Sequence, residues 1–221
     1  MRVFLVGGSP FAHKPIGMAP GLEDRVIAAD HGAHHVLAWG WPLHLLVGDL
    51  DSLAAADLQA IQAMDVPTIT APAEKDETDL ELALAEALAM GARELVICGA
   101  FGGRADHLLA NVLLLARPEL AETAAVIAEA GQTVRLLRGG MSAAGEPAHL
   151  TVTGAAGDLL TLLPLAGDAL GVTTAGLRYP LADEPLWFGR ARGVSNVLEG
   201  EHAHIWLRAG LLLVIHTRHT D

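Results

Sequence analysis

The chain of 221 residues is poor in cysteine and in aromatic side chains. It has one cysteine, Cys98, and aromatic residues make up 4% of it. A single cysteine excludes an internal disulfide framework, and its position inside the apolar run ELVICGA predicts an ordinary buried thiol. No apolar run is long enough to span a membrane, so we expect no membrane partner. The segment MRVFLVGGSP also lacks the features of a secretory signal, and we expect a cytoplasmic protein.

Positive charge is scarce as well. The sequence has 14 Lys and Arg against 26 Asp and Glu, which gives a net charge of −12. Proteins bind nucleic acid backbones through clustered Lys and Arg, so we expect no nucleic-acid partner. The acidity belongs to residues 1–130, with 18 acids against 7 basic residues, whereas residues 131–221 have 8 against 7. Such an acidic half is either a solvated surface or a set of carboxylates gathered around a cation.

The pattern of apolar runs changes near residue 131. Before it, short runs such as MRVFLVGG, RVIAAD, LHLLVGD and ELVICGA alternate with Ala/Leu-rich segments of helical length. After it, short runs such as TVRLLRGG, AHLTVTG, LWFGRARG and LLLVIHTR follow one another without helices. We therefore predict an α/β fold: an open parallel sheet flanked by helices in residues 1–130, and a smaller antiparallel β-sandwich in residues 131–221.

Charged residues close several of the expected parallel strands. Asp30 closes RVIAAD, Asp49 and Asp51 close LHLLVGD in the stretch VGDLDS, and GAFGGRADH follows ELVIC. Each Asp taken singly is typical of a strand end or a helix N-cap. In an open α/β sheet, however, ligands bind beyond the carboxyl ends of the strands. Several charged ends together therefore indicate a site.

The stretch EKDETDLELALAEALAMG predicts a helix. Thr78 followed by Glu81 is a capping box, leucines at helical spacing form an apolar stripe, and Gly91 is a plausible stop. The carboxylates Asp76 and Asp79 therefore fall at the helix start, where acids also compensate the helix dipole.

Lys75, just before this helix, is one of only two lysines in the chain. It stands among acidic neighbours. This setting fits either a surface ion pair, which contributes little, or a cation that meets a phosphate.

A second polar helix is predicted in GGRADHLLANVLLLA. Arg104, His107 and Asn111 share one face of an otherwise apolar helix, and Asp106 stands near its start. For His107 and Asn111 a set of hydrogen bonds that ties loops together is a fair alternative to ligand binding. Arg104 follows two glycines that let a backbone approach a ligand closely, so it is better suited to a phosphate fork.

The carboxylates are hard oxygen ligands of the kind that Mg²⁺ prefers. Asp49, Asp51 and Asp79 are thus candidates to hold Mg²⁺ bound to a nucleotide. The chain contains neither GxxxxGK[ST] nor GxGxxG, so a P-loop and a dinucleotide fingerprint are both excluded. The histidines of DHGAHH have no nearby cysteine and no second ligand pair at zinc spacing, which argues against zinc.

Taken together, these motifs resemble the thiamine pyrophosphokinase family. The resemblance rests on Asp30 in AADHGA, GDLDS at 48–52, KDETD at 75–79, GGRADH with Asn111 at 102–111, and LRYPLADEPLWFGRARGVSN at 177–196. The chain departs from the family pattern at His31, Leu50 and Val197. The resemblance implies an α/β nucleotide-binding domain, a C-terminal β-sandwich that binds thiamine, and a homodimer.

The activity implied is that of a thiamine diphosphokinase, which transfers a diphosphoryl group from ATP to thiamine and releases AMP. By the resemblance, the catalytic residues are Asp30, Asp49, Asp51, Lys75, Asp79 and Arg104, and Asp49, Asp51 and Asp79 hold Mg²⁺. The residues implied to bind ATP are Lys75, Asp76, Arg104, Asp106, His107 and Asn111. Those implied to bind thiamine are Ser195, Asn196 and Trp187.

Three alternatives stay open at this point. A pyrophosphokinase acting on another alcohol, such as a hydroxymethylpterin, would keep the metal and phosphate residues. A non-catalytic thiamine- or nucleotide-binding module would be expected to lose some of the acidic ligands, and all are present. Trp187 and Trp206 could also fill the sandwich core instead of stacking on a ligand.

Overall fold

The computed structural model of the chain describes residues 1–49, 53–70 and 76–219. The chain divides into two compact units, Met1–Ala130 and Gly131–Asp221. Within the described residues, no helix is long and apolar enough to cross a membrane. Cys98 is buried, and burial raises the pKa of its thiol, as expected for an inert core residue.

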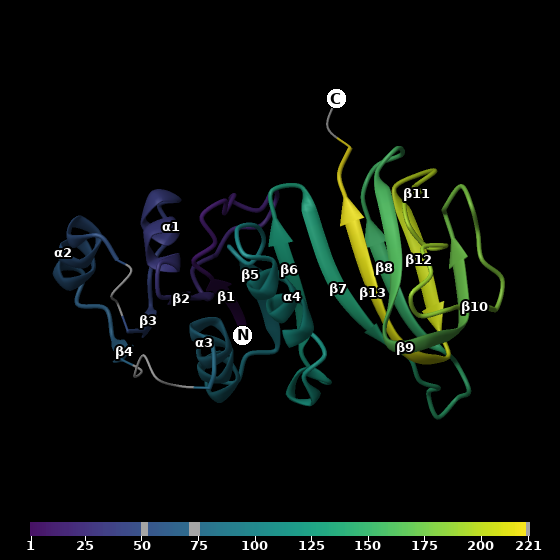
Figure 1. Cartoon of the computed structure of the whole chain (residues 1–221), viewed down its shortest axis with the longest axis horizontal. Coiled ribbons are helices and arrows are strands. Elements are labelled where there is room, and N and C mark those ends of the chain that lie inside the picture. The colour runs from purple at the N-terminus through teal and green to yellow at the C-terminus, as the bar shows by residue number, and fades with distance from the viewer. Residues whose placement is uncertain (50–52, 71–75, 220–221) are drawn as a thin grey trace. The chain divides into compact units, whose positions relative to one another are not determined.

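Unit 1 is an open sheet of parallel strands with helices packed on it (Figure 1). Its strands are β1 (Arg2–Val6), β2 (Arg25–Ala29), β3 (Leu45–Gly48), β4 (Thr68–Thr70), β5 (Glu94–Cys98) and β6 (Ala124–Glu129). Its helices are α1 (Gly32–Ala38), α2 (Ala55–Ala63), α3 (Asp79–Ala89), α4 (Ala105–Leu114) and the short η1 (Pro118–Leu120). The strand order β4-β3-β2-β1-β5-β6 reverses direction at β1. In such sheets the crevice for a ligand opens at this reversal.

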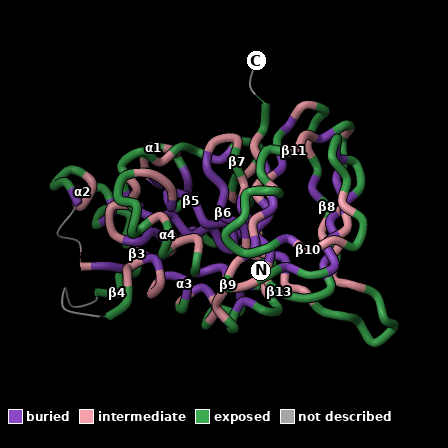
Figure 2. Tube along the Cα trace, turned by 45° about the vertical axis from the view of Figure 1, so that its right-hand side comes forward, coloured by how far each residue is buried: buried purple, intermediate pink, exposed green. Residues whose placement is uncertain are grey.

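The strands of unit 1, apart from the exposed edge strand β4, are buried on both faces. One face carries Phe4, Val6 and Val26, which pack with Ala33 and Val36 of α1 in a single apolar cluster. The alternate residues of the strands point to the opposite face, where α3 packs along β1, β2 and β3. Figure 2 shows these strands as the buried interior of the unit. Burial on both faces explains why the strands read as continuous apolar runs.

Helix α3 begins and ends where the sequence predicts. The Thr78 hydroxyl caps the helix by accepting a hydrogen bond from the Glu81 N–H at 3.2 Å. Gly91 follows the helix with φ of 83°, a left-handed conformation that favours glycine and ends the helix. The cap fixes the first turn of α3, and with it Asp79.

Unit 2 is built from antiparallel strands. They are β7 (Gln132–Arg138), β8 (Ala148–Thr153), β9 (Leu159–Ala175), β10 (Glu184–Leu186), β11 (Asn196–Val197), β12 (His202–Leu207) and β13 (Ala209–Thr217). The long strand β9 pairs with β13 through its first half and with β12 through its end, so it belongs to two sheets. Residues of both sheets, among them Leu160, Leu212 and Ile205, form one apolar core. The fold class predicted from the sequence is confirmed.

One local expectation for unit 2 is wrong, and the structure disfavours one of the two roles that the sequence left open for Trp187 and Trp206. The run LWFGRARG is not a strand: β10 ends at Leu186, and residues 187–193 form turns and irregular backbone. Trp187 is 54% exposed, so it does not fill the core. Trp206 alternates with the buried Ile205 and Leu207 and therefore faces away from the core, where its ring stacks on His149. Apolar composition alone did not distinguish an exposed aromatic turn from a strand.

Candidate functional site

A cavity of about 550 Å³ opens in unit 1 at the carboxyl ends of β1, β2 and β5. This is the reversal point of the sheet, and the volume suits a small-molecule ligand. The cavity brings together five of the residues singled out from the sequence: Asp30, Asp79, Arg104, His107 and Asn111. They come from β2, α3 and α4, so the convergence is a property of the tertiary structure.

Asp30 and Asp49 follow the neighbouring strands β2 and β3, and Asp30 packs against the end of β3 at Gly48. The Asp30 N–H donates to the Val47 carbonyl at 2.8 Å, and a Cβ on Gly48 would lie 3.1 Å from the Cβ of Asp30. Gly48 also has φ of 149°, so this position requires glycine for both space and conformation. The glycine of the GDLDS motif therefore lets the ends of β2 and β3 approach each other.

The start of α3 forms another wall of the cavity. Thr78 and Asp79 line it, whereas Asp76 is exposed and lies outside the lining. The N–H groups at the beginning of a helix favour negative charge, and Asp79 stands at that end.

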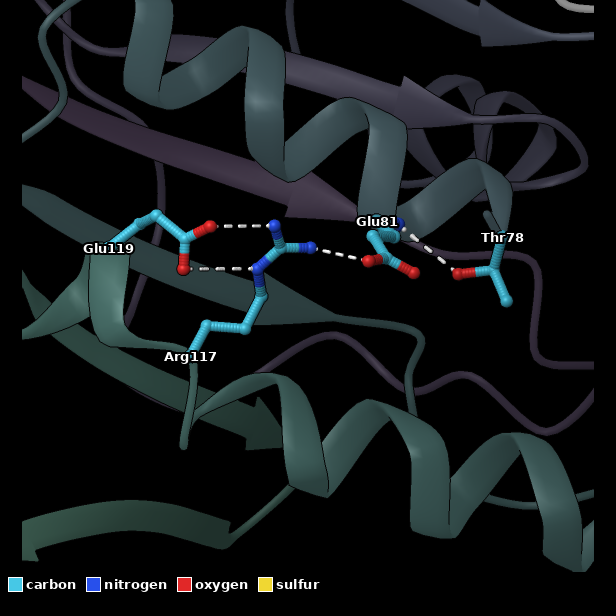
Figure 3. A network of polar contacts seen from close by, with 4 residues as sticks. All are labelled: Thr78, Glu81, Arg117 and Glu119. Atoms are coloured by element: carbon cyan, nitrogen blue, oxygen red, sulfur yellow. Dashed lines mark hydrogen bonds and ion pairs between the residues drawn. The ribbon is translucent and has the colours of Figure 1, made fainter. Parts of the chain in front are cut away.

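An arginine outside the cavity anchors this start of α3. Arg117 lies between Glu119 and Glu81 and pairs with both, while Glu81 also donates its N–H to Thr78 (Figure 3). In a full capping box the side chain of Glu81 would turn back to the Thr78 N–H. Here that side chain pairs with Arg117 and ties α3 to the segment after α4.

Arg104 is the N-cap residue of α4 and is well exposed. Its guanidinium donates to both carboxylate oxygens of Asp106, at 3.1 and 2.6 Å. This pairing lowers the pKa of Asp106 to about 2. Asp106 lies outside the cavity lining, whereas its partner Arg104 lines the cavity.

His107 and Asn111 lie one and two turns further along α4. His107 lines the cavity and is exposed. Asn111 also lines it and donates its side-chain N–H to the Ala100 carbonyl at 2.9 Å. The structure thus places Asn111 where it ties the loop after β5, the alternative that the sequence left open.

Several residues of this site escaped the sequence analysis. Ser9, after β1, lines the cavity; its N–H donates to the Gly99 carbonyl at 3.1 Å and its hydroxyl donates to the Phe101 carbonyl. The buried His35 of α1 donates a ring N–H to the Ser9 carbonyl at 2.8 Å, and burial lowers the pKa of this histidine. The paired glycines of VGGSP were the available signal for this loop.

Only some of the predicted metal ligands and phosphate-binding residues lie within the described part of the chain. Asp51, one of the three predicted metal ligands, lies outside the described residues, as does Lys75, which is predicted to meet a phosphate. Within the described part of the chain, no group of three or more His, Cys, Asp or Glu side chains is arranged to hold a metal ion. Asp49 and Asp79 offer carboxylate oxygens, the donors that Mg²⁺ prefers, and Asp79 faces the cavity. The donor chemistry of this set therefore fits Mg²⁺.

The residues assigned to thiamine lie in unit 2, between the end of β9 and β12. Ser195 is exposed with φ of 60°, and its N–H donates to the Thr161 hydroxyl at 2.9 Å. The Asn196 amide accepts from the Tyr179 N–H at 3.1 Å and donates to the Tyr179 carbonyl at 2.8 Å. Asn196 thereby fixes the segment that carries Tyr179. Tyr179, Trp187 and Phe188 are 66%, 54% and 59% exposed, an unusual concentration of exposed rings.

Two family models match the chain. "Thiamin pyrophosphokinase, catalytic domain" matches residues 22–127, and "Thiamin pyrophosphokinase, vitamin B1 binding domain" matches residues 144–212. The first covers most of unit 1 with its cavity, and the second covers most of unit 2.

Several proteins that are similar to this chain in sequence or structure are named as thiamine pyrophosphokinases. The thiamine pyrophosphokinase of Bacillus subtilis is 27% identical over 174 residues, 79% of this chain and 77% of that protein. A thiamin pyrophosphokinase family protein from Enterococcus faecalis is 30% identical, with a TM-score of 0.83 and complete coverage of both chains. The thiamin pyrophosphokinase of Geobacillus thermodenitrificans is 27% identical, with a TM-score of 0.83 over 100% of this chain and 98% of that one.

Proposed function

Because the chain belongs to the thiamine pyrophosphokinase family, we propose that it transfers the diphosphoryl group of ATP to the hydroxyl of thiamine and releases thiamine diphosphate and AMP. The observation that carries the proposal is the cavity at the reversal point of the parallel sheet, where Asp30, Asp79 and Arg104 converge. Carboxylates that can hold a cation, beside a fixed guanidinium, suit the polyphosphate chain of a nucleotide.

In the proposed reaction, the hydroxyl oxygen of thiamine forms a bond to the β-phosphorus of ATP. The bond from that phosphorus to the oxygen shared with the α-phosphorus breaks, AMP leaves, and the proton of the hydroxyl is released to water. Asp49, Asp51 and Asp79 would hold Mg²⁺, which would supply positive charge to the phosphoryl oxygens. Lys75 and Arg104 add fixed positive charge, since this kind of transfer is catalysed mainly by positioning and electrostatics.

The other predicted residues of unit 1 bind and orient the nucleotide. Asp30 orients the reacting groups from the end of β2. In this proposal His107 contacts ATP from the cavity lining and Asp76 contacts it from outside that lining, and Asn111 binds ATP from a position that its bond to Ala100 supports. Asp106 acts through its pairing with Arg104, which sets the direction of the guanidinium.

Thiamine binds, in this proposal, to the segment that carries the exposed rings of unit 2. Thiamine is an aromatic cation, which favours a π face together with hydrogen-bonding groups. Trp187 supplies a ring that is accessible, and Ser195 and Asn196, later in the same connection between β9 and β12, supply polar groups. The exposure of Trp187 supports stacking on a ligand over a role in the core.

We also propose that the protein is a homodimer. Helix α4 supports this, because Leu109 and Leu113 are 60% and 52% exposed one turn apart. Large leucines that share one exposed helix face are typical of surfaces covered by a partner.

Phosphorus NMR of the purified protein with ATP, Mg²⁺ and thiamine tests the function. We expect AMP and thiamine diphosphate to appear only when thiamine is present. AMP formed with a hydroxymethylpterin alone would keep the chemistry and replace the substrate. No AMP with any alcohol would refute the enzyme and leave a binding module.

A further inference from the structure

Glu129 is a buried carboxylate that the reaction proposed above does not use. It is the last residue of β6, which pairs in parallel with β5, and it is 6% exposed. Ionisable side chains are rarely buried to this degree unless their charge is compensated, because transfer from water costs several kcal/mol. The partners of Glu129 therefore matter.

Those partners are backbone N–H groups from two loops. One carboxylate oxygen accepts from the His13 N–H in the loop after β1, and the other accepts from the Gly99 N–H at 2.9 Å in the loop after β5. Burial raises the pKa of Glu129, and backbone hydrogen bonds from His13, Gly99 and Ala100 act in the opposite direction. One side chain thus joins two segments that are far apart in the sequence.

The two loops are the glycine-rich wall of the cavity. Gly7, Ser9, Gly99 and Ala100 all line it, and Glu129 itself does not. A Cβ on Gly99 would lie 2.3 Å from the Gly7 carbonyl oxygen, so the two backbones touch and tolerate little displacement. Gly99 has φ of 61°, a conformation that leaves its N–H directed at Glu129.

We propose that Glu129 is a positioning residue for the nucleotide: its carboxylate fixes the loops of residues 7–13 and 99–103 in the conformation that lines the cavity. This inference rests on the proposed function, since it takes the cavity to be the ATP site. Because the Gly99 N–H donates its hydrogen bond to Glu129, it is not available to bind a phosphate. Positive charge for the nucleotide then comes from side chains such as Arg104.

The chain offers a matched control. Asp158 in unit 2 is also buried, 4% exposed, and accepts hydrogen bonds from the Ala155 and His219 N–H groups, both at 2.9 Å, as well as pairing with His216. Glu129→Gln and Asp158→Asn each replace a buried carboxylate by an amide of the same size. In each variant the amide NH₂ group, a donor, faces a backbone N–H that is also a donor, so one hydrogen bond is lost. Both variants should therefore lose stability.

Hydrogen exchange of the substrate-free protein is the first readout. In Glu129→Gln we expect faster exchange in residues 9–13 and 99–103, and in Asp158→Asn no change in these segments. If Glu129→Gln does not fold, Glu129→Asp replaces it: that variant keeps the charge on a shorter side chain, and we expect a smaller acceleration in the same two segments. Unchanged exchange in both segments would overturn the proposal, whether or not the protein proves to be a kinase.

Nucleotide binding is the second readout. Calorimetry with ATP and Mg²⁺ in the absence of thiamine should show a Kd about tenfold higher in Glu129→Gln, as the loss of one buried hydrogen bond implies, and an unchanged Kd in Asp158→Asn. The kcat at saturating ATP should stay within about twofold of wild type, because Glu129 does not touch the reacting groups. Equal Kd values in the two variants would make Glu129 a structural residue only. Wild-type protein that binds ATP without turnover would refute the proposed function and leave this test intact.

Discussion

The two units of the chain place their polar residues in different ways. In unit 1 the candidate residues follow the carboxyl ends of parallel strands, so β2 and β5 deliver Asp30 and Arg104 to one cavity. In unit 2 the strands are antiparallel, and their ends point to both edges of each sheet. The candidates there lie in the connection that carries Trp187 and in β11. A parallel sheet therefore converts sequence motifs into a site more directly than an antiparallel one.

The largest effect is expected from a substitution that impairs catalysis in unit 1 and leaves thiamine binding by unit 2 unchanged. Asp79→Asn removes a carboxylate from the cavity and should lower kcat by about 10²–10³-fold, the cost typical of losing one preorganised electrostatic group. Thiamine binding should persist, since the assigned thiamine residues belong to unit 2. Steady-state kinetics and calorimetry with thiamine measure the two effects.

The control for Asp79→Asn is Glu86→Gln on the same helix, at a position that does not line the cavity. It should retain wild-type kcat. A kcat close to wild type in Asp79→Asn would contradict the assignment of Asp79.

Trp187→Ala is expected to have the opposite pattern, with weaker use of thiamine and unchanged use of ATP. Loss of an exposed ring that stacks on thiamine should raise KM for thiamine about tenfold, with KM for ATP unchanged. The free energy of unfolding should hardly change, because the side chain is 54% exposed.

Trp206→Ala is the matched control, since this ring lies on β12 and stacks on His149. Its KM for thiamine should equal that of wild type. If the two tryptophan variants behave alike, the stacking role of Trp187 is wrong.

A smaller effect concerns the stability of unit 1 in acid. Asp24 accepts hydrogen bonds from Arg2 at 2.6 and 3.1 Å and from the Gly21 N–H at 2.7 Å, and the bond to Arg2 is the main cause that lowers the pKa of Asp24 below 3.8. Because the pKa of Asp24 is lower in the folded protein than in the unfolded chain, the charged carboxylate stabilises the fold at any pH above the unfolded-state pKa. This stability is lost as the pH falls through the folded-state pKa. Asp24→Asn should therefore cost about 1–2 kcal/mol at pH 7.

Urea unfolding from pH 7 to pH 3 measures this difference. The gap between wild type and Asp24→Asn should narrow as the pH falls below 3.8, the ordinary value for Asp. A gap that stays constant over this range would show that the charge of Asp24 is not what stabilises the fold.

The smallest effect is expected for the arginine drawn in Figure 3. Arg117→Met removes the pairs with Glu81 and Glu119 and should cost at most about 1 kcal/mol, because these side chains are partly exposed and screened by water. The start of α3 should exchange hydrogen faster without a change in the core strands. Equal exchange at residues 78–82 in the two proteins would mean that the Thr78 cap alone fixes the helix.

The sequence predicted the elements of unit 1 well. Local rules suffice there: Thr78 and Gly91 mark the ends of α3, and continuous apolar runs mark strands buried on both faces. In unit 2 the same rules mistook LWFGRARG for a strand, because aromatic residues are also common in strands and an exposed turn can contain the same residue types.

Part of the candidate site was predictable and part was not. Asp30 stood out because it closes an apolar run, and Glu129 closes AAVIAE in the same way, so the signal was present for both. What the sequence could not tell is that Asp30 lines the cavity whereas Glu129 turns behind its wall toward His13 and Gly99. That difference depends on which backbone N–H groups meet each carboxylate.

The sequence by itself determined the two kinds of sheet, the caps of α3 and the family, because each rests on residue types at short spacing. Only the tertiary structure decided that Ser9, His35 and Glu129 support the cavity, and that Arg117 is tied to Glu81. These contacts join residues that are far apart in the chain. Their formation depends on how strands and helices pack, which no local pattern encodes.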